Sequence, residues 1–572
     1  MIYFIRGKDK ITLSDKDFIF QGGEGKIYGK GKTVYKIYDD LRNLIPEAKI
    51  NELKLINSNN VIKPEDIIID NNGTYIGFTM QWIKNSIPLV KLFTNDFRNR
   101  NGITIDSTLE LIEAIKEIII IIHKFNCIIV DGNEFNYMVD DKNFVVPYFI
   151  DVNSYKTPSF PPTAIMPSIR DYHSKDFNEI SDWFSFGIVS FQLLTGIHPY
   201  KGKHPSYAVK SMGDKVLENR MKDNISVFNK QVSVPPSTRD FNLIPQNYLN
   251  WFFDIFEKGL RMPPPMKAGI SVTSVVGTRI VQSSNAFEIK HIRNYDSDII
   301  EYRVVYGIEI IKTRNKIYVD NKLVYDNIIG SDVIITPNRM IPIIITLTDN
   351  FINFMPLNEK KLIIYSKIEC QDKLVIDNVL FIKNEGILTE FEFMDKDSDR
   401  IIVAVKSVWN IMPNSSFLFQ GLIYQSVMGK PYLFIPLVDG KKISCLNIYI
   451  PELEGYRIIE AKYENKICMI IAHKKHYYSK ILLKFDETYK KYDIKIKGDI
   501  DQTFLNFVVL DNGIVISIND EDYMEIFINK FGNDRIDLIK DPNINSSMKL
   551  CKEGIVTKFF RKNQIYSIKK GN

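Results

Sequence analysis

Residues 128–153 read IIVDGNEFNYMVDDKNFVVPYFIDVN, and the interpretation of the whole chain starts from this stretch. Asp131 and Asn136 stand five positions apart, and Asp151 follows the short apolar run VVPYFI. A carboxylate can accept the proton of a hydroxyl, whereas an amide and a second carboxylate supply the oxygen ligands that Mg²⁺ prefers. The spacing therefore predicts a phosphoryl-transfer loop, with Asp131 as a catalytic residue and with Asn136 and Asp151 as metal ligands.

A Gly-rich segment precedes this loop. Residues 18–38 read FIFQGGEGKIYGKGKTVYKIY, in which Gly22, Gly23 and Gly25 are followed by a predicted strand that carries Lys36. Glycines let backbone amides approach phosphates closely, and a lysine on the next strand can reach the phosphate oxygens. We therefore predict that this segment binds the phosphates of ATP and that Lys36 also serves catalysis. Taken alone, the same glycines would suit a hairpin turn.

A third stretch, residues 181–200, reads SDWFSFGIVSFQLLTGIHPY. A buried apolar helix would explain its periodicity but not its order of Asp, Trp, Ser and Gly residues. Together with the TVYK strand and the D-x-x-x-x-N loop, it resembles protein kinases over about residues 15–265. The resemblance implies a bilobal α+β kinase-like fold, ATP and Mg²⁺ as cofactors, and transfer to Ser or Thr.

The resemblance implies roles for further residues. A Glu on the predicted helix of residues 45–56 should pair with Lys36, and Glu52 is the first choice with Glu47 as the alternative. Met80 should guard the adenine pocket, residues 81–83 should form the hinge that receives the base, and Asp182 should brace the catalytic-loop backbone. The cofactor-binding residues so implied are Gly22, Gly23, Gly25, Lys36, Glu52, Met80, Gln81 and Ile83.

The chain departs from the family pattern at several supporting positions. Asn133 stands where many kinases have a lysine, which removes a positive charge from the transferring phosphoryl group. Ser168 stands where the family has a Glu, so Arg261 lacks its usual partner. Asn153 stands at the family's Gly, where we expect it to tolerate a left-handed backbone. The remaining replacements are Phe20 for the first Gly of the loop, and Ile129 and Val130 for the His and Arg before Asp131.

A helix should lead into the loop of residues 128–136. Ser107 and Glu110 have the spacing of a capping box ahead of an Ile-rich run that ends near His123. We therefore expect the helix to begin at Ser107.

After Pro265 the sequence pattern predicts strands. Short runs of Ile, Val, Phe and Tyr alternate with turn signals such as Asp439-Gly440, and hairpin units recur about every 40–55 residues. This spacing favours a β-propeller of about five to seven blades, with a pair of β-sandwiches as the alternative. The last strand, residues 564–570, is expected to close the ring against residues 270–280. The predicted domains are a kinase-like N-lobe (1–83), a C-lobe (84–270) and an all-β domain (271–572).

Composition limits the location and the partners. The net charge is only +5, from 74 basic and 69 acidic residues, so charge supports neither nucleic-acid nor membrane binding. The five cysteines are far apart, which favours a reducing compartment over disulfides or a zinc site. The start MIYFIRGKDK lacks the apolar core of a signal peptide. We expect a cytoplasmic protein, or a protein of the host cytoplasm or virion if a phage encodes it.

Two functions of different classes follow. The first is a protein kinase-like phosphotransferase using ATP and Mg²⁺, with a C-terminal β domain that binds a protein partner. The second is a catalytically silent pseudokinase that serves as a structural subunit of an oligomeric assembly, such as the portal or tail ring of a phage virion. The GGEG loop, the IVDGNEFN loop and the DWFSFG helix resemble divergent kinase-like proteins of bacteria and of large tailed, crAss-like phages. Nucleotide sensing without transfer lies between the two.

Overall fold

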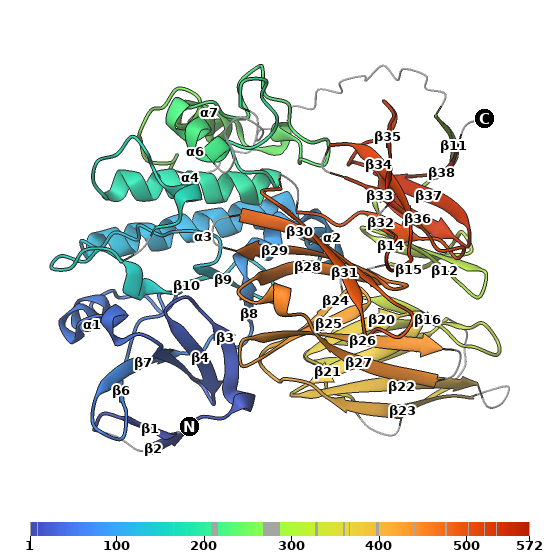
Figure 1. Cartoon of the computed structure of the whole chain (residues 1–572), viewed down its shortest axis with the longest axis horizontal. Helices are drawn as coiled ribbons and strands as arrows, with labels where there is room; N and C mark the ends of the chain where they lie inside the picture. The colour runs from blue at the N-terminus through green and yellow to red at the C-terminus, as the bar shows by residue number, and fades with distance from the viewer. Residues whose placement is uncertain are drawn as a thin grey trace.

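The computed structural model describes residues 2–7, 10–163, 165–207, 215–266, 286–326, 330–357, 361–364, 367–395, 400–439, 442–474, 477–500, 503–519, 521–533 and 535–570. A part with both a sheet and helices, up to residue 266, precedes an all-β part that starts at residue 286 (Figure 1). The predicted all-β second half is therefore confirmed. Among the described residues, no helix has the length and apolar character needed to cross a membrane.

The N-terminal sheet has seven strands in the order β2-β1-β6-β7-β5-β4-β3. Lys36 lies on β5, between β4 and β7, and its side chain is buried. Gly25 is needed for close strand approach, because a Cβ atom there would lie 2.1 Å from the carbonyl oxygen of Ile37. The strands are β1 (Ile2–Ile5), β2 (Lys10–Thr12), β3 (Phe18–Gln21), β4 (Gly25–Lys30), β5 (Thr33–Tyr38), β6 (Ile67–Ile69) and β7 (Tyr75–Gln81).

Helix α1 lies between β5 and β6 in sequence, whereas the other helices follow the sheet, and α3, α4, α6 and α7 lie above it in Figure 1. The central helix α4 is buried along almost its whole length and ends at Gly196, whose φ of 80° suits glycine. The helices are α1 (Glu47–Lys54), α2 (Asn95–Arg100), α3 (Ile105–Lys124), α4 (Glu179–Thr195), α6 (Val216–Asp223) and α7 (Gln246–Phe256). A small sheet of β8 (Ser86–Pro88), β9 (Tyr137–Asp140) and β10 (Pro147–Phe149) flanks residues 128–136, here called the Asp131 loop.

Helix α3 begins earlier than its sequence predicted. Its capping box joins Thr104 to Ser107: the Ser107 N–H donates to Thr104 Oγ1 at 3.2 Å, and the Thr104 N–H donates to Ser107 Oγ at 3.1 Å. The predicted capping box of Ser107 and Glu110 is therefore wrong. Ser107 plays the role of the third helical residue rather than of the cap, and Glu110 lies within the first turns with its side chain in solvent.

The described part of the all-β half forms seven sheets. All neighbouring strands pair antiparallel except β19 and β23, which run parallel. The strands are β11 (Phe287–Asn294), β12 (Ile299–Val305), β13 (Ile308–Thr313), β14 (Lys316–Val319), β15 (Lys322–Asp326), β16 (Asp332–Ile335), β17 (Pro342–Thr348), β18 (Phe351–Pro356), β19 (Lys361–Ile364), β20 (Asp372–Ile376), β21 (Val379–Asn384), β22 (Ile387–Asp395), β23 (Arg400–Asn410), β24 (Ser416–Phe419), β25 (Leu422–Val427), β26 (Lys430–Asp439), β27 (Lys442–Tyr449), β28 (Arg457–Glu464), β29 (Ile467–Lys474), β30 (Tyr477–Phe485), β31 (Tyr492–Gly498), β32 (Phe507–Val509), β33 (Ile514–Ile518), β34 (Tyr523–Ile528), β35 (Asp537–Lys540), β36 (Lys549–Glu553), β37 (Val556–Arg561) and β38 (Gln564–Lys570).

The first and last strands of this half belong to one sheet, in the order β11-β38-β37-β36. Hydrophobic clusters join each sheet to the next along the chain, and further clusters join the β11–β38 sheet to the sheets of β12–β15 and β32–β35. The sheets therefore follow one another in a closed circle. Strand β38 pairs with β11, whereas the partner expected for it, residues 270–280, lies outside the described residues.

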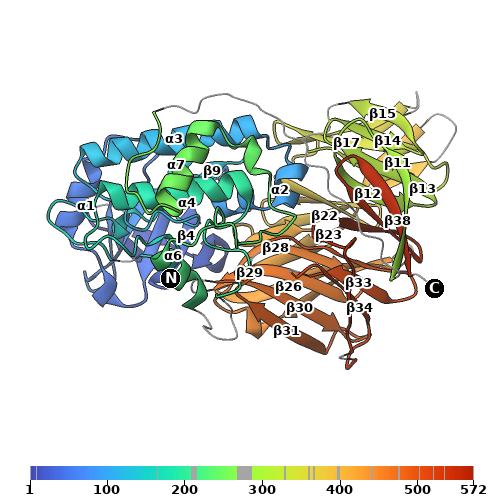
Figure 2. The same cartoon turned by 90° about the horizontal axis from the view of Figure 1, so that it is seen from above.

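The two halves lie side by side and share one hydrophobic core (Figure 2). That core contains residues of α3 and α4 together with residues of β29, β32 and β33. An ion pair joins Arg100 of α2 to the buried Glu460 of β28 at 2.9 Å, and another joins Asp96 to Lys549 at 2.6 Å. The sheet of β28–β31 thereby comes to lie against the Asp131 loop.

Candidate active site

Asp182 of α4 holds the Asp131 loop in place through hydrogen bonds to its backbone. The backbone N–H groups of Ile129 and Val130 donate to the Asp182 carboxylate at 2.8 and 2.9 Å, and Nε2 of His123 lies 2.9 Å from it. Val130 has a φ of 64°, a left-handed conformation that is costly for a β-branched residue. The predicted bracing by Asp182 is confirmed, and it holds a strained loop in place.

Asp131 itself is oriented by two donors. The backbone N–H of Met166 donates to its Oδ1 at 2.8 Å, and Nδ2 of Asn136 donates to its Oδ2 at 3.1 Å. Burial raises the pKa of Asp131, and the nearby charge of Asp151 raises it further. A fixed carboxylate with a raised pKa is well suited to accept a proton.

Lys36 and Asp151 meet across the site. The Lys36 ammonium donates to Asp151 Oδ1 at 3.1 Å, although 115 residues separate the two in sequence. In the amide orientation that satisfies both neighbours, Asn153 accepts from Lys36 at 3.2 Å and donates to Asp151 at 2.9 Å. Burial acts to lower the pKa of Lys36, but Asp151, Tyr38 and Glu24 outweigh burial, so the pKa lies above its ordinary value.

The turn that presents Asp151 differs from the expected one. Asp151 itself has the left-handed backbone, with φ 56° and ψ 33°. Asn153 lies in the 3-10 helix η4 (Val152–Ser154), so the expectation of a left-handed Asn153 is wrong. Asp tolerates a left-handed backbone better than most residues. The left-handed residue is therefore Asp151, directly before η4, and not Asn153 within it.

The partner of Lys36 is a residue that the sequence did not single out. Glu24, between the glycines of the GGEG segment, accepts from the Lys36 ammonium at 2.6 Å. The predicted Lys36–Glu52 pair is therefore wrong in this structure. Since a carboxylate on a turn between two strands is usually solvated, no local signal marked Glu24.

Helix α1 turns its acidic residues away from the site. Glu52 accepts from the backbone N–H of Ser159 at 3.2 Å, and the alternative, Glu47, pairs with Arg6 at 2.6 Å. Both carboxylates lie on the outer side of the helix because other residues form its core-facing side. The buried residues of α1 are Lys49, Ile50 and Leu53.

The Gly-rich turn is open at Gly23, whereas Glu24 of the same turn contacts Lys36. The Gly22 N–H donates to the Gly25 carbonyl at 2.8 Å, which closes a tight turn between β3 and β4. A Cβ atom on Gly23 would meet no other atom within 4 Å. Gly25 is thus explained by strand packing, whereas Gly22 and Gly23 form the open part of the turn that a phosphate could approach.

The predicted adenine-binding residues lie at the end of β7. Met80 pairs with Val34 of β5 and is half-buried, and Gln81 pairs with Thr33 and is exposed. Ile83 follows the strand, and its carbonyl accepts from the Ser86 hydroxyl at 2.7 Å. These residues therefore lie beside the strand that carries Lys36.

The expected metal ligands are brought together by backbone pairing. The N–H of Ile150 donates to the Asn136 carbonyl at 2.9 Å, which places Asn136 beside the residue that precedes Asp151. Within the described ranges, no group of three or more His, Cys, Asp and Glu residues could hold a metal ion alone. An amide and one carboxylate fit Mg²⁺, which commonly takes one or two carboxylates and completes its shell with water and phosphate oxygens.

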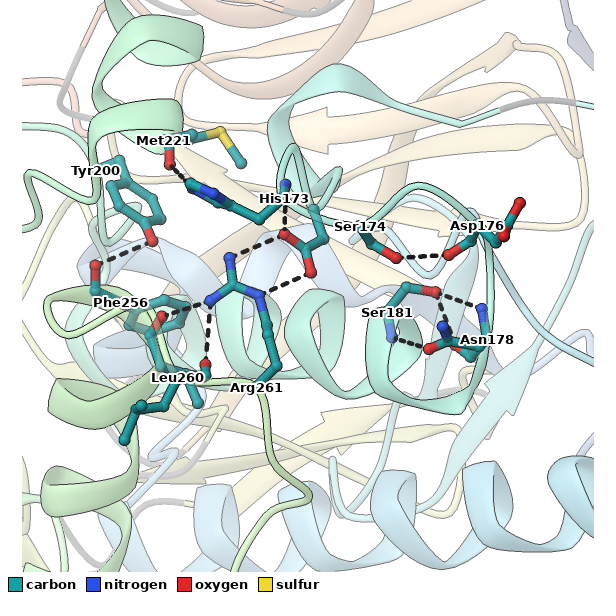
Figure 3. Close-up of polar contacts among 12 residues, drawn as sticks. His173, Ser174, Asp176, Asn178, Ser181, Tyr200, Met221, Phe256, Leu260 and Arg261 are labelled. Atoms are coloured by element: carbon teal, nitrogen blue, oxygen red, sulfur yellow. Dashed lines mark hydrogen bonds and ion pairs between the residues drawn. The ribbon is translucent and has the colours of Figure 1, made fainter.

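Arg261 has a partner that the sequence did not reveal. Its Nε and one terminal nitrogen donate to the two carboxylate oxygens of Asp171 at 2.7 and 2.8 Å (Figure 3). This bidentate pair replaces the contact that Ser168 cannot make. The carbonyl of Ser168 instead accepts from Nε2 of His198 at 2.8 Å.

The all-β half contributes side chains that contact the Asp131 loop and Phe20. Tyr478 of β30 donates its hydroxyl to buried Glu134 at 2.6 Å, and the His473 ring lies 4.3 Å from the ring of Phe135. The guanidinium of Arg457 lies 4.7 Å from the ring of Phe20. The sequence indicated only a packing or surface role for His473 and His291, and His473 does pack here. His476, of which the same was expected, lies outside the described residues.

No protein-family model matches this sequence, and no curated protein matches it either. The functional interpretation therefore depends on the motifs and on the geometry of the site.

Proposed function

We propose that the chain is a protein kinase-like phosphotransferase that uses ATP and Mg²⁺ and transfers to a Ser or Thr hydroxyl. The contact between Lys36 and Asp151, at 3.1 Å, carries this proposal. It joins the predicted phosphate-binding lysine to the predicted metal ligand, next to an Asp131 that Asn136 orients. Four polar groups from three separate segments thus converge in the arrangement that phosphoryl transfer requires.

Each residue has one role in the proposed reaction. Asp131 accepts the proton of a substrate hydroxyl while that oxygen bonds to the γ-phosphorus and the bond to the β–γ bridging oxygen breaks, which leaves ADP. Lys36 binds phosphate oxygens, and Asn136 and Asp151 hold Mg²⁺. When bound, Mg²⁺ neutralises charge on the phosphates.

The proposal includes the finer fold and the partner. Asp182 beneath the Asp131 loop and the Arg261–Asp171 pair support a bilobal kinase-like fold for the first half. Seven sheets in a closed circle, among the described residues, support a seven-bladed β-propeller for the second half. We assign to this propeller the binding of a protein partner in the cytoplasm or, for a phage protein, in the host cytoplasm or virion.

A second candidate is a catalytically silent kinase-like fold in a large assembly. The 2.6 Å pair between Lys36 and Glu24 favours it, because Glu24 takes the place beside Lys36 that a phosphate would need. In an active enzyme the phosphates must displace Glu24. In a silent one, the pair would be a permanent structural contact.

Label transfer from γ-labelled ATP separates the two candidates. The purified full chain is incubated with Mg²⁺ and labelled ATP, alone and with host lysate, beside Asp131→Asn and Asp151→Asn. We expect Asp131→Asn to lose at least about a hundredfold in rate, the usual contribution of a general base, and Asp151→Asn to lose rate as well because it removes the carboxylate ligand of Mg²⁺. The control is Asp254→Asn, which alters only the ion pair between Asp254 of α7 and Lys258 beyond the end of that helix and should keep full activity. Absence of transfer by the wild type, together with no thermal shift on adding Mg²⁺ and ATP, would leave the structural role.

A further inference from the structure

Arg457 is the first residue of β28, in the all-β half, and its side chain reaches the candidate active site. Its guanidinium carbon lies 4.7 Å from the ring centre of Phe20 and 5.0 Å from that of Phe135. Phe20 precedes the Gly-rich turn, and Phe135 belongs to the Asp131 loop. The two rings thus hold the guanidinium between the two loops that form the proposed phosphate site.

Among the described residues, nothing occupies the donors of this guanidinium. No described residue forms a hydrogen bond or an ion pair with the Arg457 side chain, although that side chain is half-buried. Burial lowers the pKa of Arg457, and the carboxylates of Asp151, Asp131 and Glu134 act in the opposite direction. A cation that is fixed by ring contacts and keeps its N–H groups unused is a ready anion-binding group.

Two departures from the kinase pattern become understandable from this arrangement. Asn133 cannot supply the missing lysine charge because its amide is neutral, and its buried side chain instead accepts from the Phe135 N–H at 2.8 Å. Phe20, in place of a glycine, provides one of the two rings that hold Arg457. Relative to the kinase pattern, Asn133 therefore lacks a positive charge. Phe20 adds an aromatic ring that positions another positive charge, that of Arg457.

We propose that Arg457 binds the phosphates of the nucleotide and replaces, from the all-β half, the positive charge that the Asp131 loop lacks. A planar guanidinium can donate two N–H groups to one phosphate, and charge that develops on the transferring group strengthens these bonds. This inference depends on the proposed nucleotide site. It makes the all-β half a part of the active site as well as a binding domain.

Nucleotide affinity tests this role without requiring transfer. Binding of ATP with Mg²⁺ and of adenosine is measured by calorimetry on the full chain, for the wild type, Arg457→Gln and Arg457→Lys. We expect Arg457→Gln to bind ATP about ten- to a hundredfold more weakly, as for a lost charged hydrogen bond, while adenosine binds unchanged. Arg457→Lys should recover part of the affinity, because it keeps the charge but not the planar geometry.

The matched control is Arg100→Gln. It removes another arginine from the same interface, one that pairs with Glu460 and lies on α2 rather than at the site. This variant should keep its ATP affinity, and equal adenosine binding in every variant shows that the site is folded.

If Arg457→Gln binds ATP as the wild type does, the role of Arg457 is refuted while the transferase proposal stands. If Arg457 matters for ATP affinity but the wild type transfers no label, the inference stands and the transferase does not. A wild type that binds no ATP would overturn both.

Discussion

Asp171 makes the contact that the kinase pattern assigns to a Glu at position 168. The Arg261 guanidinium pairs instead with a buried carboxylate three residues further along the chain, in a bidentate contact. Glu24 similarly replaces Glu52 as the partner of Lys36. In both cases the charge pairing is kept and its sequence position is not, because an ion pair depends on where a carboxylate lies in space and not on its place in a motif.

His198 provides a residue whose protonation can be followed. It is buried, its Nε2 donates to the Ser168 carbonyl at 2.8 Å, and its Nδ1 accepts the Tyr200 N–H at 3.1 Å. This pair of contacts requires the neutral ring. Burial lowers the pKa of His198 to about 3.

We expect acid to destabilise the protein partly through His198. The pKa of an unfolded His is about 6.5, so stability from the neutral ring is complete above that pH and is lost as the pH falls towards 3, by up to about 1.4 kcal/mol per pH unit. His198→Gln does not titrate, so its melting temperature should fall less steeply than that of the wild type between pH 6.5 and 4. His291→Gln, at an exposed ring on β11, should follow the wild type. Parallel slopes for wild type and His198→Gln would refute this account.

Among the elements, α3 shows how far local signals extend. Its presence and its end near His123 were predicted, since a long apolar periodicity is a strong signal. Its start was misplaced, because Ser107 is an acceptable cap by residue type and only the backbone shows that Thr104 lies outside the first turn. Helix α4 is the contrasting case, in which motif and periodicity agree over the whole element.

Substitution at the start of α3 discriminates between the two capping boxes. Thr104→Ala removes the side chain that accepts the Ser107 N–H and should lower the free energy of unfolding by about 1 kcal/mol. Glu110→Ala, at an exposed helical position, should change it by less than about 0.5 kcal/mol. Denaturant unfolding of the full chain measures both. A larger effect at Glu110 than at Thr104 would contradict the observed cap.

Across the whole molecule, the two halves depend on each other. They share a core, and buried Glu134 and Glu460 each take a partner from the opposite half. Such a large and partly apolar contact favours a fixed arrangement over two independently moving domains. The all-β half is in turn held together by β38, which pairs the end of the chain with β11.

Ring closure can be tested at one strand. Ile568 of β38 is 5% exposed and belongs to the cluster between the last two sheets, so Ile568→Asp buries an unpaired charge and should open the circle. We expect limited proteolysis to cut throughout the all-β half, including the distant sheet of β20–β23. Lys569→Asp, at the adjacent exposed position, should stay resistant. Cleavage confined to β38 and its neighbours would show that closure does not hold the ring.

The sequence by itself determined the change from mixed to all-β structure near residue 265, the position of Lys36 on a strand and the support of the Asp131 loop by Asp182. The first two features follow from local patterns of the chain, whereas the role of Asp182 was implied by the resemblance of residues 181–200 to protein kinases. Only the tertiary structure decided that Glu24 pairs with Lys36, that Asp171 pairs with Arg261 and that Arg457 enters the site. Arg457 and Phe20 are far apart in sequence, and their contact exists because a shared core fixes one half against the other. No local pattern encodes such a contact, since it depends on how separate segments pack.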